Sequence, residues 1–409
     1  LEPTYYDRLV GRYRLADGCD LVITRSIVRL FVRNSCTQVW RGLTRVSGRE
    51  WTAGDHVLSD KATLTYRFAD IDVGASASLK VLSGGKTLSA LRRDIYRREA
   101  VTFTSRDGTR LAGTLYIPTG SREPLAATVF VHGSGSQDRN GYASIIAVMA
   151  DALSASGRVV LVYDKRGVGT SSGDWSRAGF DILADDAAAG MAYLASRPEV
   201  NAARIGLAGS SQAGWVVATA IKHGAKPTDV LLLGAAGTAM TVAEQNLYNT
   251  EQRMQCSGIS ASDIAFALDQ QRAFFAFLSD PQQATRLDEL TMKARLKPVL
   301  TDWLFPDSKG IDPTRGEWYT TLDPKFDPLP VWRKYRGRAL FLFAEHDDAT
   351  PSALAIGRLM GSQITTFMLT GSQHLGLKAR NQCKAELSDV DAFSPEFFLK
   401  MAAFSRESH

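Results

Sequence analysis

The feature that most constrains the fold is a regular alternation of apolar runs and helical segments between Val101 and the C-terminus. The runs are apolar at nearly every position, as strands buried on both faces are. We expect strands over Ala127–Val131, Arg158–Tyr163, Arg204–Ala208, Val230–Leu233, Ala339–Phe343 and Thr365–Leu369. We expect helices near Ser144–Ser156, Phe180–Ser196 and Gln212–His223. This order predicts an α/β fold, with a parallel sheet covered by helices on both faces.

One connection in this region is much longer than the others. About 100 residues separate the strand near Val230 from the strand near Ala339, far more than a single strand-to-helix connection needs. The stretch contains helical, aromatic-rich segments such as Ile264–Leu278. We therefore expect a helical lid, at about residues 238–336, over the carboxyl edge of the sheet.

Residues 1–98 have a different pattern, in which short runs alternate apolar and polar side chains between turn pairs such as Asp17-Gly18. The runs are Leu21–Thr24, Val28–Val32, Thr37–Trp40, Leu64–Phe68 and Ala77–Val81. This pattern predicts a small all-β domain, a barrel or sandwich, over 1–98, followed by the α/β domain over 99–409. The arginine-rich stretch Leu88–Glu99 is interpreted as a solvated connector, with an anionic partner as the alternative.

Charge and hydropathy exclude two classes of partner. The chain has 48 Lys and Arg against 43 Asp and Glu, a net charge of +5 that is not gathered into a basic block. We therefore expect no nucleic-acid binding. The longest apolar run, Val230–Met240, is broken by Gly234 and Gly237 and is shorter than the roughly 18 residues of a membrane span, so none is expected.

The cysteines and histidines give little support for a metal site. Cys19, Cys36, Cys256 and Cys383 form no C-x-x-C pair, and the six histidines are scattered. In an exported protein, Cys19 and Cys36 would pair across a hairpin; the alternative is two buried free thiols. A Cys256–Cys383 disulfide is also left open. Because the chain starts at Leu1, we expect that a leader or tag has been removed. We expect a periplasmic or secreted location, with a cytoplasmic location as the alternative.

A candidate nucleophile follows the strand that ends near Ala208. The sequence Gly209-Ser210-Ser211-Gln212-Ala213-Gly214 joins an apolar strand to a helix through small residues, as a nucleophile elbow requires. Ser211 takes the nucleophile position, although Ala213 stands where G-x-S-x-G has its second glycine. Choosing Ser210 instead would place Gln212 at a position that needs a small residue, so Ser211 is the better register.

A glycine-rich loop after the strand near Val129 is the candidate oxyanion hole. The backbone N–H groups of Ser134 (or Gly133) and of Gln212 would hold the charge that develops on a reacting carbonyl oxygen. A phosphate-binding interpretation of the same glycines fails. Asp138 replaces the third glycine of G-x-G-x-x-G, and no G-K-[ST] follows.

An acid and a histidine follow in the order that serine hydrolases of this kind use. Asp347 lies on the loop after the strand near Phe343, with Glu345 and Asp348 as competing carboxylates. His374 follows the last predicted strand in a loop of small residues, which favours a site histidine over a core histidine. We therefore expect a triad of Ser211, Asp347 and His374.

Three stretches carry a resemblance to a known family: His132–Gly141, Tyr163–Gly173 and Gly209–Trp215. Through them, residues from about 101 to 405 resemble the α/β-hydrolase superfamily, in particular bacterial serine esterases of the serine aminopeptidase-like group. The resemblance implies the α/β-hydrolase fold and the triad, with Asp164 and Arg166 in structural contacts. The opening Gly11–Gly18 resembles the lipocalin-like barrel that is appended to some bacterial serine hydrolases.

Aromatic residues suggest an apolar acyl or aryl pocket for a medium-sized, uncharged ester. The candidate lining residues are Gly133, Phe180, Trp215, Phe274 and Trp303. Because Phe274 and Phe277 are three positions apart, packing of one helix face is the alternative. The same helices are also a candidate homodimer surface.

The predicted function is a serine esterase that works through an acyl-enzyme, with a small-molecule ester as substrate and without a metal or organic cofactor. A thioesterase, an amidase or aminopeptidase-like hydrolase, or an acyltransferase would use the same triad. From a different class, the alternative is a catalytically silent binding protein on the hydrolase fold, with the β-barrel as its working part.

Overall fold

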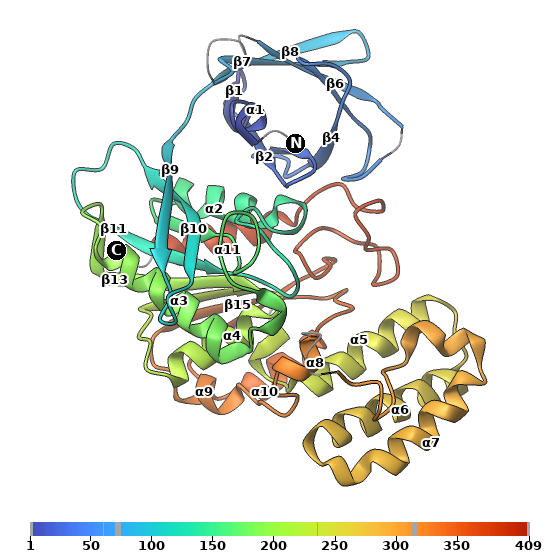
Figure 1. The fold of residues 1–409 in the computed structure, drawn as a ribbon. Helices are drawn as coiled ribbons and strands as arrows, with labels where there is room; N and C mark the ends of the chain where they lie inside the picture. Colours follow the sequence, from blue (N-terminus) through green and yellow to red (C-terminus); the bar gives the residue numbers. More distant parts are fainter. Residues whose placement is uncertain (1–2, 60, 70–74, 235, 313–316, 407–409) are drawn as a thin grey trace.

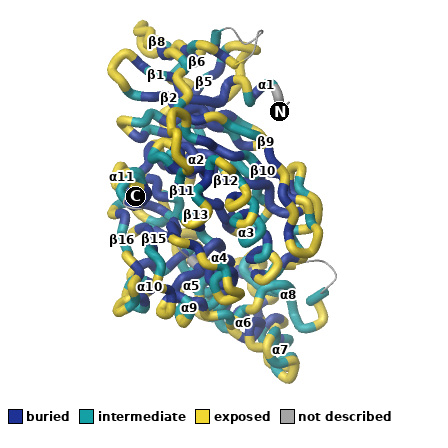
Figure 2. Tube along the Cα trace, turned by 90° about the vertical axis from the view of Figure 1, so that its left-hand side faces the viewer, coloured by how far each residue is buried: buried dark blue, intermediate teal, exposed yellow. Residues whose placement is uncertain are grey.

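The structure is a computed structural model that describes residues 3–59, 61–69, 75–234, 236–312 and 317–406. Figure 1 shows an N-terminal barrel, a central sheet flanked by helices, and a group of helices that projects from the sheet. Figure 2 shows that buried residues concentrate inside the barrel and along the sheet. The two patterns in the sequence thus correspond to two different architectures.

The N-terminal part is a closed antiparallel barrel of eight strands, in which β1 pairs with β8. Its interior is filled by apolar side chains that include Tyr13, Trp51 and Phe68. After the short helix α1 (Pro3–Asp7), the strands are β1 (Gly11–Leu15), β2 (Asp20–Arg25), β3 (Leu30–Asn34), β4 (Trp40–Arg45), β5 (Glu50–Ala53), β6 (Leu64–Ala69), β7 (Ser78–Ser83) and β8 (Lys86–Arg92). The predicted barrel is confirmed.

Parts of the barrel differ from the sequence-based prediction. The stretch Leu88–Glu99 is not a solvated connector: most of it lies in β8 and in β9 (Tyr96–Thr104), the first strand of the central sheet. The prediction failed because β8 is mostly exposed and lacks a clear apolar alternation. The predicted strand at Val28 begins only at Leu30, since Ser26–Arg29 form the turn before it. Gln38, predicted in a strand, has a left-handed φ of 62°.

The central sheet has the strand order β16-β15-β14-β13-β11-β12-β10-β9. The strands after β9 are β10 (Arg110–Pro118), β11 (Leu125–Val131), β12 (Val159–Tyr163), β13 (Val200–Ser210), β14 (Asp229–Leu233), β15 (Arg338–Ala344) and β16 (Thr365–Leu369). From β12 to β16 neighbouring strands are parallel, while β10 runs antiparallel to both of its neighbours. The carboxyl ends of the parallel strands therefore meet at one edge, where loops can bring distant residues together.

Helices cover both faces of this sheet, as predicted. One face packs on α3 (Phe180–Ala195) and α4 (Ala213–Lys222), and the other packs on α2 (Ile145–Ala155) and α11 (Pro395–Arg406). Along β11 the side chains of Val129 and Val131 enter the first core, and that of Phe130 enters the second. This alternation is what a strand buried on both sides requires.

Helices between β14 and β15 form an insertion with apolar cores of its own. They are α5 (Val242–Cys256), α6 (Ala261–Ser279), α7 (Ala284–Arg295) and the 3-10 helix η6 (Pro298–Trp303). We call Val242–Trp303 the helical insertion. The short helices α8 (Trp318–Thr321) and α9 (Leu329–Lys334) lead from it back to the sheet. Helix α10 (Ser352–Leu359) follows β15. A capping box of Thr241 and Glu244 fixes the start of α5.

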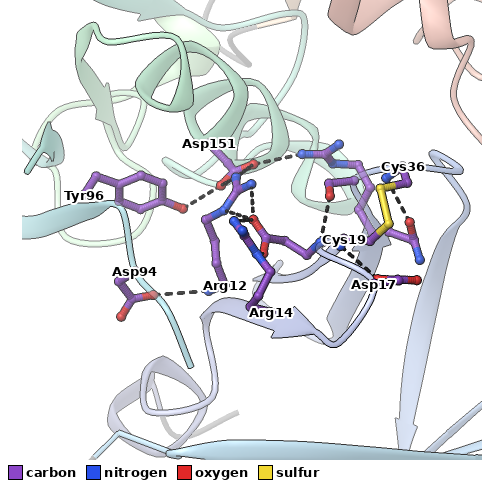
Figure 3. A network of polar contacts seen from close by, with 12 residues as sticks. Arg12, Arg14, Asp17, Cys19, Cys36, Asp94, Tyr96 and Asp151 are labelled. Atoms are coloured by element: carbon purple, nitrogen blue, oxygen red, sulfur yellow. Dashed lines mark hydrogen bonds and ion pairs between the residues drawn. A yellow bond between two sulfur atoms is a disulfide. The ribbon is translucent and has the colours of Figure 1, made fainter. Parts of the chain in front are cut away.

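Buried charges join the barrel to the sheet domain (Figure 3). Asp151 on α2 accepts hydrogen bonds from Arg12 of β1 and Arg33 of β3, each at 2.8 Å, and from the hydroxyl of Tyr96 at 2.8 Å. Nearby, the hydroxyls of Thr24 and Ser144 are 2.8 Å apart. Because an unpaired charge in such a place would be strongly destabilising, this network fixes how the barrel docks.

The cysteines form two disulfides, Cys19–Cys36 and Cys256–Cys383. The β2–β3 hairpin pairs Leu21 with Asn34, and the Cys19–Cys36 disulfide lies just beyond this end of the hairpin. Among the described residues, no helix combines the length and the hydropathy that crossing a membrane requires.

Candidate active site

Ser211 occupies the turn between β13 and α4 in a left-handed conformation, with φ 54°. This backbone is strained for a residue with a side chain, and such strain concentrates at functional sites. A Cβ on Gly209 would lie 2.4 Å from that of Ala213 and 2.7 Å from the carbonyl oxygen of Val131. Glycine is therefore required at 209 because strand and helix approach each other closely.

The departure from G-x-S-x-G at Ala213 has a packing explanation. The methyl group of Ala213 points into the space that the missing side chain of Gly209 leaves. The displaced glycine, Gly214, meets the loop after β14, where its Cβ would be 2.6 Å from the carbonyl carbon of Gly237. The turn of Ser211 therefore has two close contacts, one between Gly209 and Ala213 and one between Gly214 and Gly237.

Asp347 and His374 meet across the loops that follow β15 and β16. The imidazole Nδ1 lies 2.9 Å from both carboxylate oxygens of Asp347. Asp347 is almost fully buried, and its Oδ1 accepts the backbone N–H groups of Ala349 and Thr350 at 2.8 Å. These bonds fix the carboxylate, which in turn orients the ring.

The electrostatics of this pair favour the protonated imidazole. Burial lowers the pKa of His374, but the negative charge and the hydrogen bond of Asp347 outweigh it, so the pKa is raised above 6.5. The competing carboxylates are in different surroundings. Glu345 accepts the backbone N–H of Gly371 at 2.7 Å, and burial raises the pKa of Asp348. Of the three, Asp347 is the one that contacts the imidazole.

Ser211 and His374 are brought to the same place by the backbone of β14. The amide of Ser211 donates to the carbonyl of Leu233 at 3.0 Å, and the next residue, Gly234, lies against the imidazole. A Cβ on Gly234 would be 2.9 Å from both Cε1 and Nδ1 of that ring. Within the described residues, the Ser211 hydroxyl forms no hydrogen bond to the imidazole, whose Nε2 is the nitrogen that Asp347 leaves available.

The predicted oxyanion loop lies directly against the nucleophile turn, since a Cβ on Gly133 would be 3.5 Å from that of Ser211. The backbone N–H groups of Ser134 and Gln212 donate to no other described residue. Before the loop, the Nε2 atom of His132 is 2.6 Å from the carbonyl oxygen of Tyr163, which holds the start of the loop. Burial lowers the pKa of His132 to about 3, so its ring stays neutral.

Lys165 is a site residue that the sequence analysis missed. Its buried ammonium donates to the carbonyls of Gly133 at 2.9 Å and Gly135 at 3.1 Å, and to the side-chain oxygen of Gln212 at 3.1 Å. Burial lowers the pKa of this lysine to about 7. The available signal was a charged residue directly after a buried strand, between Asp164 and Arg166. Those two form ion pairs with Arg139 and Asp186, the structural contacts that were expected.

A cavity of about 410 Å³ opens beside Ser211. Its apolar wall includes Trp175, Trp215 and Trp318, and its polar wall includes Asn246 and Asn249. Phe180 lies behind this wall, stacked on Trp215 with ring centroids 5.7 Å apart. The cavity is thus apolar on one side and able to form hydrogen bonds on the other.

Two of the candidate pocket residues lie elsewhere. Phe274 is fully buried in the helical insertion, stacked on Phe305 at 4.4 Å, so its spacing from Phe277 reflects packing within the helices. Trp303 lines a second cavity of about 410 Å³, which contains His374.

The helical insertion is tied to the loop of the acid. From α5, the hydroxyl of Tyr248 donates to the carbonyl of Asp347 at 3.0 Å, and the amide of Asn249 donates to that of Asp348 at 2.9 Å. The Cys256–Cys383 disulfide joins the end of α5 to the segment after His374. Within the described residues, no group of three or more His, Cys, Asp or Glu side chains is placed to hold a metal ion.

Part of the chain is similar to other proteins. The uncharacterized protein YfhR of Salmonella typhimurium (strain LT2) is 34% identical over 128 residues, which is 31% of this chain and 41% of YfhR. The chain thus matches less than half the length of that relative.

Solved structures similar to this chain include the hypothetical protein PA2218 from Pseudomonas aeruginosa, with 18% identity, a TM-score of 0.49, and coverage of 77% of this chain and 94% of that chain. Est1E from Butyrivibrio proteoclasticus, solved with ferulic acid bound, has 15% identity, a TM-score of 0.46, and coverage of 75% and 97%.

The profile of the Alpha/beta hydrolase family matches residues 128–381, which is more than half of the chain. This region begins in β11, before the oxyanion loop, and extends beyond His374. The strand order, the elbow at Ser211 and this match agree, and the chain belongs to the alpha/beta hydrolase family.

Proposed function

We propose that the protein is a serine esterase, which cleaves carboxylic esters through an acyl-enzyme formed on Ser211. Membership of the alpha/beta hydrolase family supports a hydrolase. The observation that carries the proposal is the bond between Nδ1 of His374 and buried Asp347, at the sheet edge where Ser211 is held in strained backbone. This arrangement leaves Nε2 as the base for the serine hydroxyl.

In the first step, His374 takes the proton of Ser211 as the serine oxygen attacks the ester carbonyl carbon. The carbonyl oxygen becomes negatively charged and is held by the N–H groups of Gln212 and Ser134. When the intermediate collapses, the carbon–oxygen bond to the alcohol breaks and His374 gives its proton to the leaving alcohol. Catalytic hydrogen bonds often tighten only when substrate binds, so the missing Ser211–His374 bond is consistent with this step.

In the second step, His374 takes a proton from water, which attacks the acyl carbon. Collapse of this intermediate breaks the bond to Ser211, returns the proton to the serine and releases the acid. Asp347 keeps the imidazole in one orientation and stabilises its charged form in both steps. An ester suits this machinery better than an amide, because a leaving alcohol needs less help from the general acid.

Covalent labelling tests the proposal. A fluorophosphonate probe should label the wild-type protein at Ser211, and Ser211→Ala should lose labelling and about 10⁶-fold in turnover of a nitrophenyl ester while keeping its fold. Ser210→Ala changes the neighbouring serine and is the matched control, which should keep both. Unlabelled wild-type protein, or an active Ser211→Ala variant, would show that the nucleophile is assigned wrongly.

We also propose that the protein works in an oxidising compartment, the periplasm or the outside of the cell. Two disulfides support this location, because the cytoplasm of most organisms keeps thiols reduced. Cell fractionation followed by alkylation of the denatured protein tests it. The expected result is exported protein without reactive thiols; a cytoplasmic protein with four alkylated cysteines would contradict the proposal.

A further inference from the structure

A third cavity, of about 560 Å³, lies between the barrel and the oxyanion loop. On the barrel side it is lined by the β2–β3 turn, Ser26–Arg29, together with Phe31 and Leu58. On the other side it is lined by Ser134–Asp138, Gly141–Ala143 and Leu387. The barrel therefore forms one wall of a space whose opposite wall includes the predicted oxyanion donor.

This cavity adjoins the cavities that contain Ser211 and His374. It shares Ser134 and Gly135 with the cavity that contains Ser211. It shares Tyr142 and Leu387 with the cavity that contains His374. The cavity at the barrel therefore borders both the cavity of Ser211 and the cavity of His374.

The barrel turn presents apolar side chains to this space. Ile27 is 55% exposed and Val28 is 79% exposed, although both are aliphatic. Exposed aliphatic pairs beside a cavity mark binding surfaces when the cavity itself is apolar. Buried Phe31 and Leu387 extend the same apolar surface inward.

The barrel is held in a fixed position relative to the opposite wall of the cavity. The amide of Leu58 donates to the carbonyl of Leu387 at 2.8 Å, and both residues line the cavity. Thr24, just before the turn, contacts Ser144, which has a left-handed φ of 67°. Together with the ion pairs of Asp151 (Figure 3), these contacts make the barrel a structural part of the cavity.

We propose that the barrel completes the substrate site, and that Ile27, Val28, Phe31, Tyr142 and Leu387 form a barrel subsite for the apolar alcohol portion of an ester. The proposal rests on the proposed esterase function. The leaving alcohol must lie beside His374, which protonates it, and the His374 cavity borders the barrel subsite at Tyr142 and Leu387. The tryptophan-lined cavity beside Ser211 is then left for the acyl portion.

Val28→Asp tests the subsite, because it places a charge at the tip of the turn without disturbing a core. Val46→Asp is the matched control: Val46 is a 60% exposed aliphatic residue on another barrel turn and lines none of the three cavities. Two series of esters are compared, acetates of alcohols from ethyl to octyl and ethyl esters of acids from acetate to octanoate. Melting temperatures check that both variants fold.

Val28→Asp should lose about tenfold or more in kcat/KM for octyl acetate, mainly through KM, and stay near wild type for ethyl acetate and for the acyl series. Val46→Asp should match wild type throughout. Unchanged octyl acetate hydrolysis in Val28→Asp, an equal loss in both variants, or a loss confined to the long acyl esters would overturn the assignment.

Fluorophosphonate labelling separates this result from the proposed function. If Ser211 is labelled and ethyl acetate is cleaved, the esterase proposal stands even when the barrel subsite fails. If wild-type protein is neither labelled nor active, both the esterase proposal and the barrel-subsite proposal are wrong.

Discussion

The side-chain nitrogen of Lys165 lies 3.1 Å from the side-chain oxygen of Gln212 and joins the turn of Ser211 to the loop that faces it. The same nitrogen holds the carbonyls of Gly133 and Gly135, on either side of Ser134. One buried lysine thus contacts Gln212 directly and holds the two residues that flank Ser134. It fixes the surroundings of both predicted oxyanion donors. Lys165 is a positioning residue in this arrangement, because its hydrogen bonds go to the protein.

Replacing Lys165 with an apolar residue of similar length tests this positioning role. Lys165→Met should lower kcat about 10- to 100-fold and change KM little, since the oxyanion is held mainly in the transition state. Lys86→Met, at the exposed start of β8, is the control and should leave both constants unchanged. Steady-state kinetics and a melting curve check this. A loss of melting temperature with kcat intact would assign Lys165 to stability alone.

The pH dependence should report the partnership of Asp347 and His374. The base works only when neutral, so kcat/KM should fall as pH drops through the pKa of His374. Because the carboxylate raises that pKa, the midpoint of the acid limb should lie above 6.5. Asp347→Asn removes the charge and leaves burial, so the limb should move to lower pH while turnover falls about 10⁴-fold.

Glu345→Gln is the control for this experiment, because an amide oxygen can still accept the N–H of Gly371. Its pH–rate profile should match that of wild type. A shift of the acid limb in Glu345→Gln but not in Asp347→Asn would show that the orienting carboxylate is at position 345.

Much of the fold around the candidate site could be predicted because its signals are local. Strands such as β12 and β14 are nearly continuous buried apolar runs, and the observed β16, Thr365–Leu369, has the predicted bounds. The elbow at Ser211 depends on small residues within five positions of sequence, and the loops of Asp347 and His374 directly follow their strands. Because the strands are parallel, these loops must meet at one edge of the sheet, so their proximity follows from the predicted fold alone.

The features that could not be predicted depend on contacts between distant segments. Lys165 has its role because three carbonyl oxygens from two other loops surround it. Cys256 and Cys383 are 127 residues apart, and their pairing follows from how the helical insertion docks. Likewise β8 is recognisable only through its pairing with β1 and β7, since most of its side chains face solvent.

Gly234 provides a test of the position of the imidazole. In Gly234→Ala the new methyl group would lie 2.5 Å from the backbone carbonyl oxygen of His374 and 2.9 Å from two atoms of its ring. The residue and its ring should therefore be displaced, and kcat/KM should fall about 100-fold or more. Gly224→Ala is the matched control, because Gly224 is also left-handed, with φ +100°, but has nothing within 4 Å of the added carbon. Both variants should lose some stability. Equal activity of the two variants would mean that the ring is not held against Gly234.

The two disulfides should contribute unequally to stability and activity. In the chain-entropy model, closing a loop of 127 residues stabilises by about 5 kcal/mol, and closing one of 17 residues by about 3 kcal/mol. The double variant Cys256→Ser/Cys383→Ser should therefore melt lower than Cys19→Ser/Cys36→Ser. It should also lose kcat/KM below its melting temperature, because α5 carries Tyr248 and Asn249, which hold the loop of Asp347. Calorimetry and ester kinetics on the two variants measure both effects. Full activity without the Cys256–Cys383 bond would show that the hydrogen bonds of α5 hold this loop without it.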